Sequence, residues 1–238
     1  MPVEALDVLR VVALSLFAGG TSFVGALISK YVKFSEDHIL FLTAFGAGIL
    51  ISAAIFEMII EAEKVIGIFL VLFLFVLGSI IFTIADVLAE RKGGGAGILL
   101  GIGLDTVPES LAIGASLASG TGLVIALLIG IQNLPEGIAS YREMMSSSTK
   151  TAFNTDRKAL GAIGIVSIMP IILGLIGLFY LQGMGIVIAI TLALSAGGIF
   201  YMLFYDMIPR AHKEKKWLPT FGSVLGFIIG FAFVQLIH

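Results

Sequence analysis

Apolar residues occur along the chain in eight runs of roughly 20 residues, separated by short polar stretches. A helix of this length crosses the hydrocarbon core of a bilayer. The runs contain glycine and lack the strict apolar–polar alternation of barrel strands. They predict an all-α polytopic membrane protein with eight transmembrane helices in one transmembrane domain. The expected spans are about 8–30, 38–61, 65–88, 96–118, 121–141, 159–180, 184–208 and 217–237, within a domain of residues 1–238.

Composition excludes an ordinary soluble domain and several kinds of partner. Of the 238 residues 58% are hydrophobic and 13% are charged. The net charge of −2 and the scattered basic residues give no reason to expect nucleic acid binding. Because the chain has no cysteine, it can form neither a disulfide framework nor a thiolate metal site.

The positions of lysine and arginine predict the orientation in the membrane. All fourteen basic residues except Arg10 and Lys64 fall after odd-numbered runs. Basic residues are retained in the cytoplasm, so we expect both termini on the non-cytoplasmic side of the cell membrane. The stretch at about 142–158, which contains SSSTKT, is then expected to be a flexible cytoplasmic loop.

A short internal echo hints at an inverted repeat. Residues 47–48 and 56–59 in the second run match 196–197 and 205–208 in the seventh, each at an offset of 149. The fourth and fifth runs echo each other at an offset of 27. Transporters are often built from inverted repeats with the site at the repeat interface, but short echoes in glycine-rich apolar sequence also arise by chance.

Two strings place Pro-Glu in the middle of consecutive apolar runs, DTVPES at 105–110 and QNLPEG at 132–137. A charge at the bilayer centre costs about 2.5 to 3.5 kcal/mol on the insertion scale, so a function that uses the charge is expected. Spacings of three and four residues put the polar side chains of each string on one helical face. The candidate ligands are Asp105, Glu109, Gln132, Asn133 and Glu136.

The prolines in these strings are expected to free backbone oxygens near the carboxylates. Pro108 and Pro135 cannot donate to the carbonyls of Leu104 and Ile131. Facing carboxylates repel one another unless a cation or protons neutralise them, and a divalent ion does so economically. The alternative is a pair of proline-kinked helices whose protonated glutamates serve packing alone.

With these motifs the chain resembles the ZIP (Zrt-, Irt-like protein) family of divalent metal transporters, especially its short prokaryotic branch. The strings that carry the resemblance are FGAGIL, LDTVPESLAIG, IQNLPEGIAS and AGGIFYMLFYDMIPRAH. The resemblance implies a two-metal centre between the fourth and fifth spans and a mobile block of helices. It also implies elevator-like movement of zinc, iron or manganese toward the cytoplasm.

The family pattern is matched residue by residue only in part. Glu109, Gln132, Asn133 and Glu136 coincide with family metal positions, whereas Asp105 stands where the family usually has His.

Further departures concern the second metal position and the preference for zinc. Thr106 stands where Asn is usual, and Met169 where related members have Glu before Pro. Tyr205 replaces a frequent His and leaves Asp206 as the matching carboxylate. Thr106, Met169, Asp206 and Glu57 are therefore candidates for a weaker metal or pathway role.

Histidine usage indicates an oxygen-rich centre. The three histidines, His38, His212 and His238, lie outside the middles of the expected spans. Carboxylate and amide oxygens suit manganese and magnesium and tolerate ferrous iron better than they select zinc. We therefore expect broad selectivity, or selectivity that leans toward manganese and iron.

The carboxylates of Glu57 and Asp206 lie near the ends of their expected spans, and each has two possible roles. Glu57, with Glu61 and Glu63, either draws cations to an entrance or forms an acidic, solvated helix end. Asp206 either lines a cytoplasmic exit or forms a helix-end salt bridge with Arg210.

Alternatives from other functional classes stay open or fail in detail. A degenerate family member that binds or senses metal and a cation channel both remain open. An intramembrane aspartyl protease fails because Leu104 separates Gly103 from Asp105 in its GxGD pattern. We expect no enzyme activity, no catalytic cofactor, and a divalent metal and the lipid bilayer as partners, with a homodimer as an open alternative.

Overall fold

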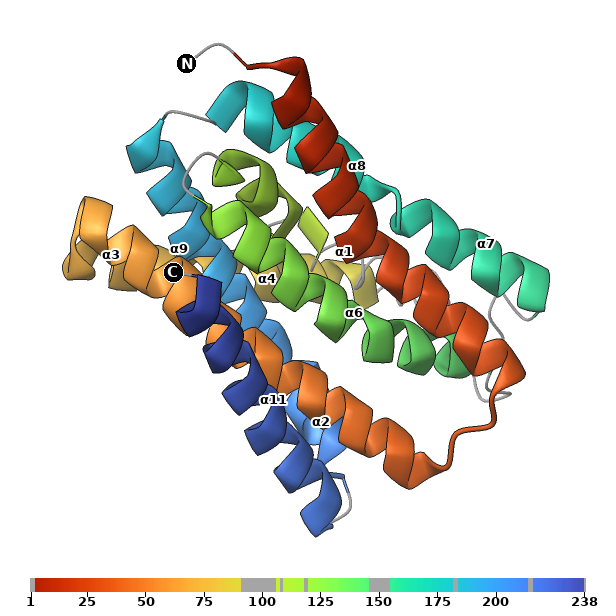
Figure 1. Ribbon diagram of the computed structural model, residues 1–238. Helices are drawn as coiled ribbons and strands as arrows, with labels where there is room; N and C mark the ends of the chain where they lie inside the picture. The colour runs from red at the N-terminus through yellow and green to blue at the C-terminus, as the bar shows by residue number, and fades with distance from the viewer. Residues whose placement is uncertain are drawn as a thin grey trace.

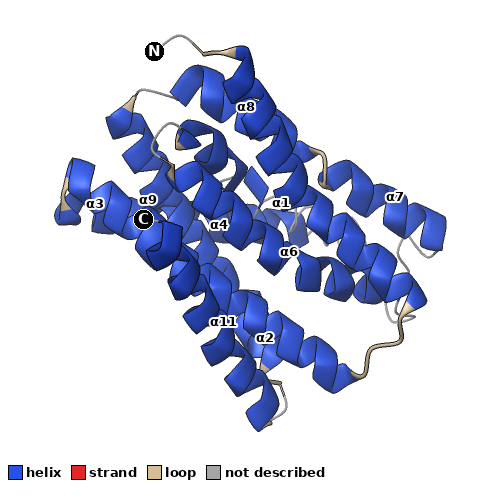
Figure 2. Ribbon diagram, viewed as in Figure 1, coloured by secondary structure: helices blue, strands red, loops and turns tan. Residues whose placement is uncertain are grey.

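The chain folds as a bundle of long helices (Figures 1 and 2). The computed structural model describes residues 3–90, 106–107, 109–117, 120–145, 155–181, 184–213 and 216–237. Across these residues there is no β-strand, and helices are joined by short turns. The prediction of an all-α architecture is therefore confirmed.

The helices follow the apolar runs closely. In chain order the elements are α1 (Ala5–Tyr31), α2 (Glu36–Ser52), η1 (Ala53–Ile59), α3 (Ile60–Ile66), α4 (Ile68–Glu90), a helical stretch at 109–115, α6 (Thr121–Met145), α7 (Asp156–Val166), α8 (Met169–Ile176), η3 (Gly177–Leu181), α9 (Gly185–Met202), η4 (Leu203–Met207), α10 (Ile208–Ala211) and α11 (Trp217–Ile237). Gly67, with φ of 76°, makes the tight turn between α3 and α4.

Seven helical segments in the described part of the chain are long and apolar enough to cross a membrane. They correspond to seven of the eight expected spans, with ends that differ by a few residues. The remaining expected span, 96–118, lies largely outside the described residues, and the part that is described is helical at 109–115. The chain is therefore a polytopic membrane protein.

The expected loop at about 142–158 is shorter than predicted. Helix α6 continues to Met145 and α7 begins at Asp156, while 146–154 lie outside the described residues. Tyr141 donates a 2.8 Å hydrogen bond to Asp156, whose carboxylate also lies 3.5 Å from the Lys30 ammonium. The prediction was wrong at both ends because these polar residues belong to helix ends that pack on α1.

The helices form two groups. Helix α1 packs along α6 and against α7 and α8, whereas α2 packs along α11 and α4 packs along α9. Figure 1 shows α1, α6, α7 and α8 on one side of the molecule and α2 with α11 on the other. The groups meet mainly where α2 contacts α6.

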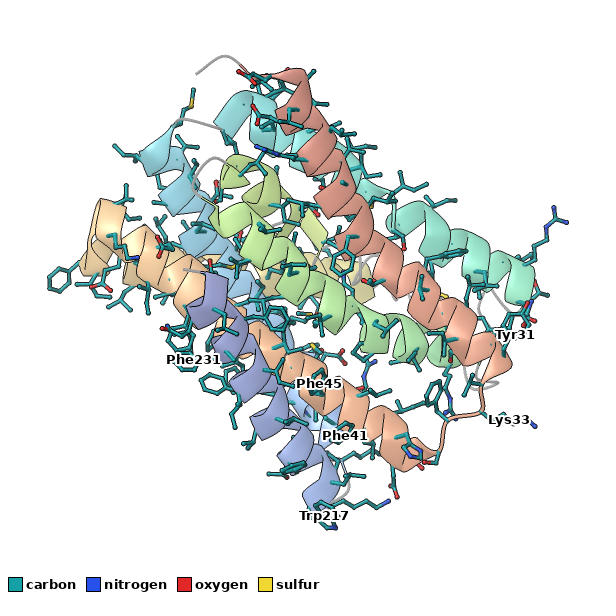
Figure 3. The ribbon with its side chains drawn as sticks, in the orientation of Figure 1. Tyr31, Lys33, Phe41, Phe45, Trp217 and Phe231 are labelled. Carbon is teal, nitrogen blue, oxygen red and sulfur yellow. The ribbon has the colours of Figure 1, made fainter. Side chains whose placement is uncertain are left out.

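Small residues allow close approach in the second group. A Cβ on Gly226 of α11 would lie 2.0 Å from the Phe45 carbonyl oxygen of α2. Figure 3 shows Phe41 and Phe45 at this contact. On the other pair, Tyr201 of α9 donates a 2.9 Å hydrogen bond to Asp86 of α4. Membrane helices associate through such close packing and through hydrogen bonds.

Two π-helical turns coincide with the internal echo. The turn η1 follows α2, and η4 follows α9. Shifted by the offset of 149, residues 203–207 of η4 fall on 54–58, inside η1. Both spans thus depart from α-helical geometry at the positions where their sequences match. A π-turn is frequently found at functional sites, and Glu57 and Asp206 occupy equivalent positions in the two turns.

Candidate metal centre

Four of the five candidate ligands lie in the described part of the chain, and they gather at the contact between two helices. Glu109 is 4% exposed, Gln132 is 1% exposed and Asn133 is buried as well. Glu136 is half-buried and close enough to Glu109 for their charges to repel. Asp105 and Pro108 lie outside the described residues. The helix at 109–115 and α6 therefore bring two carboxylates together inside the bundle.

Helix α6 continues through Pro135. The proline nitrogen carries no hydrogen, so the Ile131 carbonyl loses its donor one turn later. The amide of Gln132 donates a 3.1 Å hydrogen bond from Nε2 to Glu136 Oε2. This bond orients both side chains along the same face of α6.

The amide oxygen of Gln132 is an acceptor whose bonding capacity is unused in the described part of the chain. Its Oε1 is buried and has no hydrogen-bond partner among the described residues. An unmade hydrogen bond at a buried acceptor costs about 1–3 kcal/mol. A cation bound beside Glu136 would offset this cost. Gly46 of α2 faces the Gln132 side chain, and a Cβ added to it would lie 3.3 Å from Gln132 Cγ.

Asn133 is fixed by α1. Its Nδ2 donates a 2.8 Å hydrogen bond to the Ala18 carbonyl oxygen. Because this bond uses the amide nitrogen, Oδ1 is the atom available to a ligand. The side chains thus offer two carboxylates and two amide oxygens. In the described residues no three His, Cys, Asp or Glu side chains converge.

A small cavity borders Glu136 on the side of α1 and α7. Its volume is about 10 Å³. The residues that line it are Gly19, Ser22, Thr106, Asn133, Glu136, Gly137, Ser140, Ile163, Val166, Ser167 and Pro170. Of the weaker candidates, Thr106 therefore lies at the centre, beside Glu136.

The family comparison decides what kind of protein carries this centre. The family model described as ZIP zinc transporter matches residues 87–238, which is more than half of the chain. The chain belongs to the ZIP zinc transporter family. It is therefore an integral membrane protein that transports divalent metal ions, and it is not an enzyme. The sequence has no match among curated proteins.

The ZIP match includes the helix at 109–115, all of α6 and the π-turn η4, but it leaves out α1, α2 and η1. Both carboxylates of the centre lie in the matched part. Gly19 and Ser22 of α1, which line the cavity with Glu136, and Gly46 of α2, which lies near Gln132, are in the unmatched part. The position of these α1 and α2 residues beside the centre of this ZIP transporter is therefore an observation from its structure and not from the family match.

Met169 lies apart from the cavity. It is half-buried at the first residue of α8, while Ser167 and Pro170 on either side of it line the cavity. In this ZIP transporter the junction of α7 and α8 thus presents a hydroxyl group to Glu136.

Glu57 corrects the interpretation of an acidic, solvated helix end. It is 0% exposed, because the π-turn η1 directs it into the protein where η1 packs on α9. Glu61, in contrast, pairs with Lys64, and Glu63 is exposed. The three glutamates therefore do not form one surface cluster.

Asp206 forms the salt bridge with Arg210. Both carboxylate oxygens accept hydrogen bonds of 2.7 Å from Arg210 Nη2, and the pair is half exposed. Both charges lie within electrostatic range of Glu136. Asp206 is thus neutralised by a neighbour at the end of the span rather than left as a bare carboxylate.

Sequence reasoning missed the serines that line the cavity, Ser22, Ser140 and Ser167. A signal for Ser140 existed, because it follows Glu136 by four residues and extends the stripe that begins at Gln132. Ser22 and Ser167 come from other helices, and no spacing along the chain connects them to Glu136.

Proposed function

We propose that this ZIP transporter carries zinc, iron or manganese toward the cytoplasm through a centre formed by Glu109, Gln132, Asn133 and Glu136. The observation that carries the proposal is the meeting of the buried Glu109 and the half-buried Glu136 beside the Gln132 oxygen, which has no hydrogen-bond partner among the described residues. Asp105, one turn before Glu109 in sequence, is proposed as a further ligand, and Pro108 and Pro135 as the residues that free backbone oxygens nearby.

The donor set bears on which ion is carried. Its members are hard oxygens, and no imidazole is among them. Such a set suits manganese and ferrous iron and selects zinc poorly. We therefore expect manganese or iron to be transported at least as well as zinc.

The arrangement of helices supports elevator-like alternating access within a single domain, 1–238. One group holds α1, α6, α7 and α8 and most of the centre, and it meets the second group mainly at the α2–α6 contact. Gly46 of α2 brings no side chain to this contact, and a Cβ added there would lie 3.3 Å from Gln132 Cγ.

Orientation follows from charge and from the layout of the termini. Figure 1 shows both marked termini toward the same end of the bundle. Figure 3 places Tyr31, Lys33 and Trp217 toward the opposite end. Lysine is enriched on the cytoplasmic side, and exposed aromatic residues are typical of either membrane interface. Both termini are therefore proposed to lie on the non-cytoplasmic side of the cell membrane.

Peripheral residues are given lesser roles. Glu57 and Asp206, at equivalent positions of η1 and η4, are proposed to lie along the pathway on either side of the centre. Thr106 is proposed to contact the centre through the cavity beside Glu136. Met169 is kept as a residue that influences ion preference from outside the cavity.

The test is uptake by purified protein in liposomes, with zinc, manganese, ferrous iron, cadmium and magnesium compared side by side. Glu109→Gln and Glu136→Gln keep the side-chain shape and remove one charge each. Loss of a charge next to a divalent ion costs several kcal/mol, so uptake should fall at least about 100-fold. Glu63→Gln, the same change at an exposed glutamate, is the matched control and should transport normally.

Each result separates the candidate functions. Saturable uptake that both variants abolish supports a carrier with this centre. Flux that does not saturate indicates a channel, and tight metal binding without flux indicates a sensor. Normal uptake by both glutamine variants would show that the ion binds elsewhere.

A further inference from the structure

The cavity beside Glu136 collects hydroxyl groups from separate parts of the bundle. Ser22 lies on α1, Ser140 on α6, and Ser167 at the junction of α7 and α8. All three serines are buried. The hydroxyl of Ser167, at 8% exposure, has no hydrogen-bond partner among the described residues. A buried hydroxyl without a partner destabilises the fold, so an occupant that bonds to it is expected.

The polar groups around the cavity match the needs of one water molecule. Ionised Glu136 can only accept hydrogen bonds, and Asn133 offers its Oδ1 as an acceptor while one of its two amide N–H groups donates to Ala18. These side chains therefore offer acceptors to the two hydrogens of a water. Serine hydroxyls can donate to its oxygen. A volume of about 10 Å³ is close to that of a single water-sized particle.

A second divalent ion fits the same cavity poorly. Among the described residues on its lining Glu136 is the one carboxylate, and in the proposed function that charge is already shared with the transported ion. The junction of α7 and α8 contributes the neutral Ser167, while Met169 lies outside the lining. A hard divalent ion requires compensating negative charge as well as oxygen ligands, and the other described oxygens of this lining belong to neutral hydroxyl and amide groups.

We propose that the cavity is a binding site for one water molecule, held by Glu136, Asn133 and the serine hydroxyls, in the place of a second metal ion. The water gives Glu136 a hydrogen-bond donor at every stage, including the stage at which the transported ion has left. One consequence, which rests on the proposed function, is that this transporter holds one divalent ion at its centre instead of two.

Radiolytic footprinting tests the water site directly. Hydroxyl radicals formed from a trapped water oxidise the side chains next to it, so Ile163, Val166 and Pro170 should be labelled although all three are buried. Ile199 and Leu178 are equally buried, lie outside the cavity lining, and should stay unlabelled. The absence of label at all three lining residues of the wild-type protein would overturn the proposal.

Two substitutions assign the label to this cavity. Ser167→Val removes a hydroxyl and fills the space with a methyl group, and labelling of Ile163 and Pro170 should fall at least about fivefold. Ser140→Val fills the cavity from α6 and serves if the first variant does not fold. Undiminished labelling in a folded variant would place the water elsewhere and refute the assignment.

Equilibrium dialysis with manganese counts the ions. Relative to a Glu109→Gln/Glu136→Gln double variant, the wild-type protein and Ser167→Val should each bind one manganese ion per chain. Two ions in the wild type and one in Ser167→Val would overturn the proposal in favour of a second metal. A sodium ion bound by the wild type and lost in Ser167→Val would overturn it as well. If the wild type bound no manganese, the proposed function would fail while the footprinting result decided the water site.

Discussion

Alanine at Gly137 is expected to push α1 and α6 apart at the metal centre. A Cβ at this position would lie 1.9 Å from the Ser22 carbonyl oxygen, 2.7 Å from its carbonyl carbon and 2.9 Å from its Cα. All three atoms belong to the backbone of α1, so no flexible side chain can move away. The oxygen contact alone requires a separation of 1.1 Å to reach the 3.0 Å at which real Cβ contacts begin.

The cost of Gly137→Ala can be worked out from this separation. Overpacking a close contact costs about 1–3 kcal/mol, and alanine returns about 1 kcal/mol of helix propensity. The net loss of up to about 2 kcal/mol should lower the Tm by roughly 2–8 °C. The same movement stretches the 2.8 Å bond from Asn133 to Ala18 beyond hydrogen-bond range, which adds about 1 kcal/mol. Uptake below saturation should therefore fall about fivefold.

The assay combines manganese uptake in proteoliposomes with thermal unfolding in detergent. Gly20→Ala is the matched control, because Gly20 lies on α1 and an added Cβ meets nothing within 4 Å. This control should transport normally and gain up to about 1 kcal/mol of stability. A Gly137→Ala protein with the Tm and uptake of the wild type would refute the reasoning, since it would show that α1 and α6 do not approach so closely.

Two further substitutions test interactions at the edges of the bundle. Arg210→Gln breaks a half-exposed ion pair, whose contribution to stability is about 0–1 kcal/mol. The KM for metal uptake should therefore change by no more than about fivefold. A change above tenfold would mean that Asp206 and Arg210 affect metal transport more strongly than their exposure implies. Tyr201→Phe deletes the hydrogen bond to Asp86 and should cost about 1.5–3 kcal/mol, measured by thermal unfolding, without altering the order of ion preference. Tyr180→Phe, at an exposed tyrosine, is its control, and equal Tm values for the two variants would contradict the importance of the Asp86 contact.

Span positions were predictable because the bilayer imposes a single length on every apolar helix. The residues of the α6 stripe were predictable for a similar reason, since Gln132, Glu136 and Ser140 recur at the helical period. Helix ends were less predictable. Asp156 looked like part of a polar loop, yet it starts α7 because Tyr141 and Lys30 hold its carboxylate.

Contacts between distant segments left no periodic trace in the sequence. The burial of Glu57 depends on the π-turn η1, which changes the face that the residue presents. The interpretation of Glu57, Glu61 and Glu63 as one acidic, solvated helix end is wrong for Glu57, which is buried. Ser22 and Ser167 meet Glu136 only through the packing of α1 and α7 on α6. Residues brought together by packing can be recognised only after the helices are placed.

The paired π-turns also bear on how the chain tolerates changes in length. A deletion of one residue in a regular α-helix rotates all following residues about the helix axis by about 100°, because the α-helix has about 3.6 residues per turn. A π-turn contains one residue more than an α-turn, so a single deletion there can restore regular geometry and leave the following residues on their original faces. In η1 and η4, therefore, the membrane helices can lose a residue without misdirecting α3 or the Arg210 segment of α10.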